Sequence, residues 1–79
     1  MNTFFTYILY SKKLEKYYVG QSSDLFQRIE NHNSGLSKFT KNGIPWTLIW
    51  STELPSRQEA LILEKKIKNM GAKRFLENR

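Results

Sequence analysis

Runs of aromatic and apolar residues, separated by polar segments, predict three strands in this chain. Residues 4–10 are mostly aromatic or apolar, and residues 17–19 form a shorter run of the same kind. The polar segment 11–16 between them has the character of a turn, so the two runs are expected to form a β-hairpin. A third run, residues 46–52, is rich in tryptophan and β-branched residues and predicts a third strand of the same sheet.

A helix is expected immediately after the hairpin, with Gly20 ending the second strand. Ser23 or Asp24 supplies the side-chain oxygen that an N-cap needs. The pair Ser34-Gly35 is typical of a helix end, so the helix is expected to run to about Asn33.

A second, longer helix is expected from about Arg57 to Asn69, where apolar residues recur at helical spacing. A proline–serine pair favours its start and Gly71 favours its end, and residues 72–77 follow as a short last helix. This order of elements predicts an α/β fold of the α+β kind, a three-stranded antiparallel sheet flanked by about three helices. The whole chain, residues 1–79, is expected to form one domain.

Composition narrows the environment and the partners of the protein. There is no cysteine, so neither a disulfide nor a thiolate metal site is available. Residues 1–5 have no basic start and no long apolar run, and no segment has the roughly 20 apolar residues of a membrane helix. We therefore expect a cytoplasmic protein with no membrane contact, whose oligomeric state remains open. The net charge of +6 favours a nucleic-acid partner, with a lysine-rich surface that only serves solubility as the alternative.

Four polar side chains are expected to lie around one small surface. The hairpin is expected to place Tyr7 and Tyr18 side by side, and Arg28 and His32 are four residues apart on one face of the first helix. On that helix Leu25 and Ile29 form an apolar stripe, which His32 continues and which Arg28 borders. Polar side chains thus occupy positions where the helical spacing of apolar residues predicts core residues. A fixed cation beside groups able to move protons is what phosphodiester cleavage requires.

Each of these residues also has a purely structural interpretation. His32 can pack or cap, Arg28 can extend to solvent, and the tyrosines can pair across the hairpin as packing aromatics. On the second helix Glu64 lies at the edge of the apolar stripe, where it either pairs with Lys68 or points into a cleft. The ordered set therefore carries more information than any single member.

The ordered set resembles the GIY-YIG nuclease family. In that family one strand ends in Gly-Ile-Tyr and the next in Tyr-Ile-Gly, an arginine follows on a helix, and a metal-binding glutamate lies on a later helix. The matching residues are Tyr7, Tyr18-Val19-Gly20, Arg28 and Glu64. His32 resembles a histidine that many members carry one turn after the arginine, and the resemblance extends from about Phe5 to Lys68.

The match departs from the family pattern at three points. Phe5-Thr6 stand where Gly-Ile is expected, although Thr and Phe also favour strands. Gln21 follows Gly20 where some members have a lysine, so one cation that can lower a tyrosine pKa is missing. Asn78 is the sole candidate for an asparagine that some members carry near the C-terminus. These departures concern the rate more than the fold.

The resemblance implies a metal-dependent endonuclease that hydrolyses phosphodiester bonds in DNA, with a role in repair or recombination and with RNA as another substrate. One Mg²⁺ or Mn²⁺ is expected on Glu64 and a phosphate oxygen on Arg28. The base is a tyrosine or His32, and Tyr7 is favoured over Tyr18. Two other interpretations stay open: a nucleic-acid-binding module that has lost turnover, and a structural domain for protein contacts.

The loop of residues 36–45 has two interpretations of its own. Lys38, Phe39 and Lys41 can grip a phosphate backbone and stack on a base. The favoured interpretation is an ordinary solvated loop with Phe39 as its hydrophobic anchor.

Overall fold

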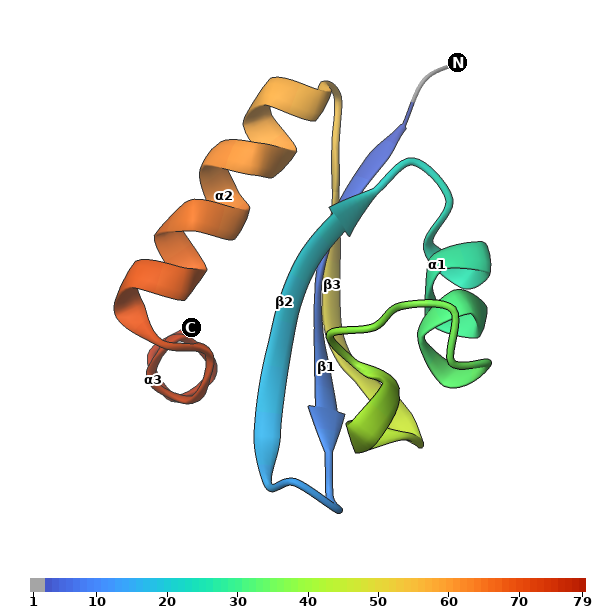
Figure 1. Cartoon of the computed structure of the whole chain (residues 1–79). Helices are drawn as coiled ribbons and strands as arrows, with labels where there is room; N and C mark the ends of the chain where they lie inside the picture. Colours follow the sequence, from blue (N-terminus) through green and yellow to red (C-terminus); the bar gives the residue numbers. More distant parts are fainter. Residues whose placement is uncertain (1–2) are drawn as a thin grey trace.

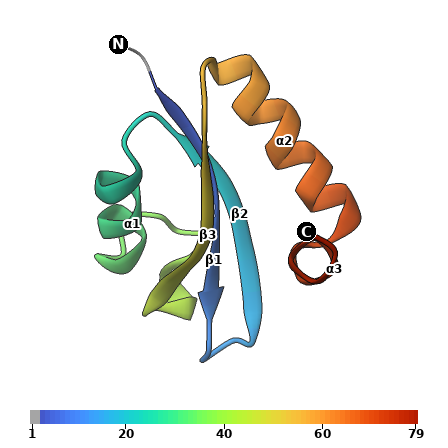
Figure 2. The same ribbon diagram turned by 180° about the vertical axis from the view of Figure 1, so that it is seen from behind.

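Three strands form one antiparallel sheet that lies between helices (Figures 1 and 2). The structure is a computed structural model that describes residues 3–79. Met1 and Asn2 lie outside the described residues. The predictions for the N-terminal segment and for the domain as residues 1–79 include these two residues. Strands β1 (Phe4–Ser11) and β2 (Lys16–Ser22) form the hairpin. Strand β3 (Trp46–Leu54) pairs with the other edge of β1 and gives the order β2-β1-β3, so the predicted fold class is confirmed.

Two helices pack on opposite faces of this sheet (Figure 1). Helix α1 (Leu25–Asn33) lies on one face, and α2 (Arg57–Met70) lies on the other, with α3 (Ala72–Glu77) at its end. A single 3₁₀ turn, η1 (Lys41–Gly43), interrupts the loop between α1 and β3. None of the helices formed by the described residues has the length and hydrophobicity that crossing a membrane requires.

Side-chain caps explain where the two longer helices begin. Of the two predicted caps of α1, Asp24 is the one used, and its carboxylate accepts a hydrogen bond from the backbone N–H of Gln27 at 3.1 Å. At the start of α2 the Ser56 hydroxyl oxygen accepts from the backbone N–H of Glu59, and the Ser56 hydroxyl donates to the Glu59 carboxylate. Both pairings satisfy backbone or side-chain groups that the first turn leaves free.

The alternation of side chains along β1 divides the core between the two faces. Tyr7 and Leu9 pack with Leu25 of α1, whereas Ile8 packs with Ile67 of α2. Because helices cover both faces of the central strand, its four middle residues, 6–9, are all buried.

Helix α2 is joined to the central strand by a buried hydrogen bond as well as by apolar contacts. The Thr6 hydroxyl donates to the carbonyl of Ala60 at 2.8 Å, so the threonine that replaces the family's isoleucine serves the packing of this helix. The apolar stripe that the sequence predicts on this helix consists of Ala60, Leu63, Ile67 and Met70. Ala60 and Ile67 are buried, and Leu63 packs against the cluster that contains Ile67. Met70, the last residue of α2, is 39% exposed and so does not belong to the core as expected.

Gly20 does not end its strand as expected. It lies inside β2, opposite Tyr7, because the hairpin ladder continues to Ser22. A Cβ atom at Gly20 would lie 2.5 Å from the Tyr7 hydroxyl oxygen and 3.0 Å from the Tyr18 ring. The glycine is therefore required by the close approach of two aromatic rings.

We predict that Gly20→Ala lowers the free energy of unfolding by about 1–3 kcal/mol, the usual cost of overpacking a filled site. The added methyl group has to displace the Tyr7 and Tyr18 rings. Urea denaturation measures the change, and the matched control is Gln21→Ala, one residue further along β2, with an expected change of about 0.5 kcal/mol or less. Equal stability of Gly20→Ala and wild type would contradict the packing argument.

Candidate active site

Three aromatic rings meet on the face of the sheet that α1 covers. Tyr7 is opposite Gly20 and Tyr18 is opposite Leu9, so the two tyrosines are diagonal neighbours and not directly opposed. Their ring centroids are 6.4 Å apart. The His32 ring of α1 lies edge-on to Tyr18 with a centroid distance of 4.7 Å. The structure thus brings both predicted tyrosines and the predicted histidine together.

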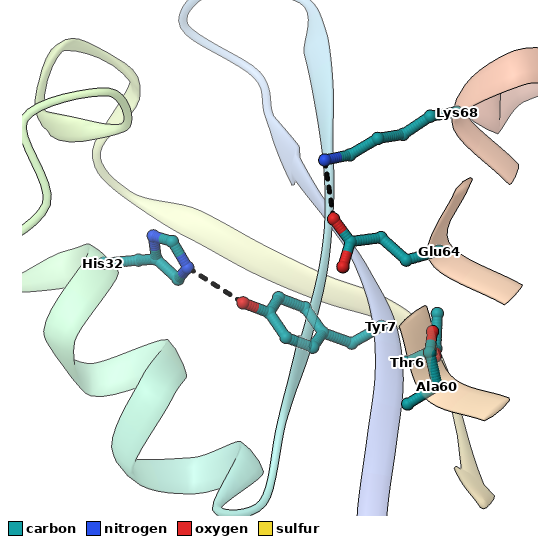
Figure 3. Close-up of polar contacts among 6 residues, drawn as sticks. All are labelled: Thr6, Tyr7, His32, Ala60, Glu64 and Lys68. Carbon is teal, nitrogen blue, oxygen red and sulfur yellow. Dashed lines mark hydrogen bonds and ion pairs between the residues drawn. The ribbon is translucent and has the colours of Figure 1, made fainter. Parts of the chain in front are cut away.

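His32 is buried and hydrogen-bonded through both ring nitrogens. Its Nε2 lies 3.1 Å from the Tyr7 hydroxyl oxygen (Figure 3), and its Nδ1 lies 2.8 Å from the Thr40 hydroxyl oxygen. The exposed fractions of Tyr7 and His32 are both 0%, and that of Thr40 is 1%. These contacts form a continuous polar line inside an otherwise aromatic cluster.

Arg28 lies beside the two phenols at the edge of this cluster. Hydrogen-bonding contact with Tyr7, and to a smaller extent with Tyr18, raises the pKa of Arg28 above its ordinary value. Its Nε atom is buried and has no hydrogen-bond partner within residues 3–79. A buried donor without a partner is costly, and the guanidinium is a planar fork that suits a phosphate oxygen.

Burial also sets the protonation states of the two hydrogen-bonded rings. Desolvation raises the pKa of Tyr7 to about 12, and the charges of Tyr18 and Glu64 act in the same direction while Arg28 opposes them. Desolvation and the nearby Arg28 charge lower the pKa of His32 below its ordinary 6.5. At neutral pH the phenol therefore keeps its proton, and the imidazole is neutral.

Glu64 comes from α2, on the other side of the sheet from α1 (Figures 1 and 3). Its Oε2 atom lies 2.6 Å from Nζ of Lys68, and its side chain is 17% exposed. The expected pairing with Lys68 is thus present, and the Glu64 charge still contributes to the raised pKa of Tyr7. The acid belongs to the same electrostatic neighbourhood as the aromatic cluster.

An open cavity of about 490 Å³ lies along β2 beside these residues. Tyr18 and Lys68 line it, whereas the buried Tyr7 and His32 do not. We also expected Tyr7, Tyr18, Arg28, His32 and Glu64 to share one solvent-reachable cleft. Of these five residues Tyr18 alone lines this cavity, so the cavity does not bring the predicted site residues together.

The residues that hold His32 in place were absent from the sequence-based candidates. The Trp46 indole N–H donates to the Thr40 carbonyl at 2.6 Å. The Asn33 side chain pairs with the backbone N–H and carbonyl of Trp46, which fastens the end of α1 to the start of β3. The loop around Thr40 has no periodic pattern, so no local signal distinguishes this threonine from its neighbours.

The expectation that Phe39 anchors the loop is wrong. Its side chain is 95% exposed, and the adjacent Thr40 is the buried anchor. The hydroxyl and carbonyl of Thr40 find partners in His32 and Trp46, which an aromatic ring at this position cannot provide.

A metal ion at the predicted position would have one carboxylate, that of Glu64, to bind it. Within residues 3–79 no group of three or more His, Cys, Asp or Glu side chains could hold an ion. Such a lone carboxylate would be compatible with Mg²⁺, because this ion keeps several waters and is often held by one or two carboxylates.

The comparisons with known proteins identify the class. The family model of the GIY-YIG catalytic domain matches residues 3–78, so this chain belongs to the GIY-YIG nuclease family. Similar proteins carry the name UPF0213 protein.

Two of these relatives illustrate the degree of similarity. The UPF0213 protein YsiG of Lactococcus lactis subsp. lactis is 37% identical over 65 residues, which cover 81% of this chain and 62% of YsiG. The UPF0213 protein BH0048 of Halalkalibacterium halodurans is 31% identical over 71 residues, which cover 89% of this chain and 74% of BH0048. This chain thus spans under two thirds of the length of YsiG.

A solved structure supports the same assignment. The solution NMR structure of the UPF0213 protein BH0048 from Bacillus halodurans has a TM-score of 0.58 and 29% sequence identity. The similarity covers 95% of this chain and 80% of that chain.

We predict that His32 titrates below 6.5 in the folded protein. The unfolded chain then takes up the proton first as pH falls, so this contribution to stability is complete above about pH 6.5 and is lost as pH drops toward the folded pKa. His32 is the single histidine of the chain, so its NMR signals between about pH 8 and about pH 5 report the pKa without ambiguity. Arg28→Met should raise the His32 pKa, and a wild-type value at or above 6.5 would contradict the prediction.

Proposed function

We propose that this protein is a metal-dependent endonuclease that hydrolyses phosphodiester bonds in DNA. The supporting observation is the buried Tyr7–His32 hydrogen bond beside Arg28, whose Nε has no partner among the described residues. The net charge of +6 favours a nucleic-acid substrate. We propose the cytoplasm as the place of action and repair or recombination as the context, with RNA as the alternative substrate.

Arg28 is proposed to bind a non-bridging oxygen of the scissile phosphate. The charge of the phosphoryl group grows during attack, and a fixed guanidinium already in place needs no reorganisation to stabilise it. The neighbouring phenols of Tyr7 and Tyr18 raise the pKa of Arg28, so its guanidinium keeps its charge.

Tyr7 and His32 are proposed to share the role of base. A free tyrosinate with a pKa of about 12 costs about 5 kcal/mol at about pH 8, from four units at about 1.36 kcal/mol each. Tyr7 is fully buried in the free protein, so the proposal requires that substrate binding beside Arg28 gives a water access to the Tyr7 oxygen. The cost is then avoided if this water gives its proton to the Tyr7 oxygen while the Tyr7 proton passes to Nε2 of His32. The neutral imidazole is available for this because its pKa is lowered.

Glu64 is proposed to hold one Mg²⁺ or Mn²⁺. Its carboxylate is partly exposed and lies close enough to the cluster to affect the Tyr7 pKa. A bound ion supplies Lewis-acid stabilisation of the leaving oxygen. Lys68, which now neutralises Glu64, is then free to bind a neighbouring phosphate.

A second candidate is a nucleic-acid-binding module without turnover. Gln21 supports it, because this neutral amide stands where some family members have a lysine and accepts a hydrogen bond from Arg57 at 3.2 Å. No cation at position 21 then helps to ionise a phenol.

We predict that Glu64→Gln and Arg28→Ala each reduce DNA cleavage at least about a hundred-fold, because each removes a charge that acts on the transition state. A nicking assay with Mg²⁺ and Mn²⁺ on plasmid, branched and single-stranded DNA measures this. DNA binding and melting temperature should change little. Glu59→Gln is the matched control, since Glu59 lies on the same helix but contacts Ser56.

Three results would redirect this proposal. Cleavage by Glu64→Gln at saturating metal would mean that another acid, or no metal, takes part. A wild-type protein that binds DNA but cleaves no DNA or RNA would favour the binding module. Failure to bind nucleic acid even at low salt would favour a structural domain, because phosphate contacts strengthen as salt falls.

A further inference from the structure

We propose that Thr40 is a positioning residue that fixes the tautomer of His32, with the proton on Nδ1 and the lone pair of Nε2 facing Tyr7. The catalytic consequence rests on the proposed function, whereas the tautomer itself follows from hydrogen bonds within the protein.

The Tyr7 side determines one half of this assignment. The Tyr7 hydroxyl is fully buried, and its side-chain hydrogen-bond partner within residues 3–79 is His32 Nε2 at 3.1 Å. The phenol proton therefore points to Nε2, which must offer a lone pair. If Nε2 carried the proton instead, the phenol would accept from it and its own buried hydrogen would have no partner, which is costly.

The Thr40 side determines the other half. A neutral imidazole has one N–H, which must then be on Nδ1 and donate to the Thr40 hydroxyl oxygen at 2.8 Å. The Thr40 hydroxyl in turn donates to the Ser37 carbonyl at 3.5 Å. The hydrogen bonds therefore run in one direction from Tyr7 through His32 and Thr40 to the loop backbone.

Thr40 is itself held firmly enough to orient the ring. Its carbonyl accepts from the Trp46 indole N–H at 2.6 Å and from the backbone N–H of Gly43 at 3.1 Å. An orienting group behind a catalytic imidazole is a general device. A hydroxyl at this position orients the ring without adding negative charge, so it leaves the lowered pKa of His32 unchanged.

The test combines nitrogen NMR of His32 with cleavage kinetics. In the wild type we expect the Nδ1–H tautomer. Thr40→Val should shift the population toward Nε2–H and lower kcat by about ten- to a hundred-fold, as loss of an outer orienting partner does, with KM unchanged. Thr40→Ser should restore both readouts, and Thr47→Val, at an exposed threonine of β3, should alter neither.

Each outcome is decisive for Thr40. An Nε2–H tautomer in the folded wild type, or a folded Thr40→Val protein with unchanged tautomer and pH profile, overturns the proposal. A wild type that has the Nδ1–H tautomer lost in Thr40→Val, but cleaves nothing, supports the Thr40 assignment while the proposed nuclease function fails.

We also infer that Phe39 stacks on an unpaired base, which makes single-stranded or locally opened nucleic acid the substrate class. This deepens the proposed function and rests on a separate observation, the 95% exposure of the Phe39 ring. Exposed lysines at positions 38 and 41 flank it and complement a phosphate backbone. Aromatic rings among lysines are the usual platform for single strands.

The position of the ring is set by its neighbour. The hydrogen bond between Thr40 and His32 ties the loop between α1 and β3 to the candidate site, so the adjacent Phe39 is held near that site before any substrate arrives. A preorganised platform loses less entropy on binding than a mobile one.

Binding without divalent metal tests this inference independently of cleavage. Fluorescence anisotropy with a labelled single-stranded oligonucleotide should show that Phe39→Ala weakens binding about five-fold or more, whereas affinity for a duplex of equal length changes less than about two-fold. Phe39→Trp should bind like the wild type. Phe26→Ala is the matched control, because this ring of α1 is also exposed, at 82%.

Three results would overturn the Phe39 inference. They are an unchanged single-strand affinity in Phe39→Ala, an equal loss for duplex, and an equal loss in Phe26→Ala. The last two would indicate a general effect of removing an exposed aromatic ring. If the protein cleaves no nucleic acid but still shows single-strand binding that depends on Phe39, the Phe39 inference is supported although the proposed nuclease function fails.

Discussion

The close contact between the Tyr7 ring and the backbone of Gly20 is the constraint on which the candidate site depends. A side chain at position 20 would occupy the space of the Tyr7 hydroxyl. Because that space is free, the phenol crosses the hairpin and reaches His32 on α1. Tyr18, whose ring also lies close to Gly20, packs edge-on against the same histidine ring. The absence of a side chain at Gly20 thus allows the Tyr7–His32 hydrogen bond, which connects the hairpin to α1.

Burial of that hydrogen bond determines the chemistry available to the cluster. Removal from water keeps the proton on Tyr7 and keeps His32 neutral, because both charged forms lose solvation. Arg28 remains the fixed cation of the cluster, and its contact with the phenols raises its own pKa. The arrangement places a proton donor, a proton acceptor and a cation in one cluster, which is the combination that phosphodiester hydrolysis uses.

The sheet separates this cluster from the acidic side chain that completes the family pattern. Glu64 is carried by α2, which the Thr6–Ala60 hydrogen bond and the buried Ile67 hold against the opposite face. The position of the acid relative to the phenols is therefore a property of how both helices pack on one central strand. A change in the packing of α2 should disturb the site without touching any of its aromatic residues.

The sequence by itself determined the elements, their order and most of the candidate site. The signals that predicted them are local ones. Apolar runs indicate which side of a strand or helix is buried, and a capping residue such as Asp24 indicates where a helix begins. Only the tertiary structure decided that Gly20 continues its strand, that Phe39 is exposed, and that Thr40 supports the histidine. These features depend on contacts between segments distant in the chain, such as the Tyr7–His32 pair, and no local pattern of residues specifies which hydroxyl will meet which ring nitrogen once the helices pack.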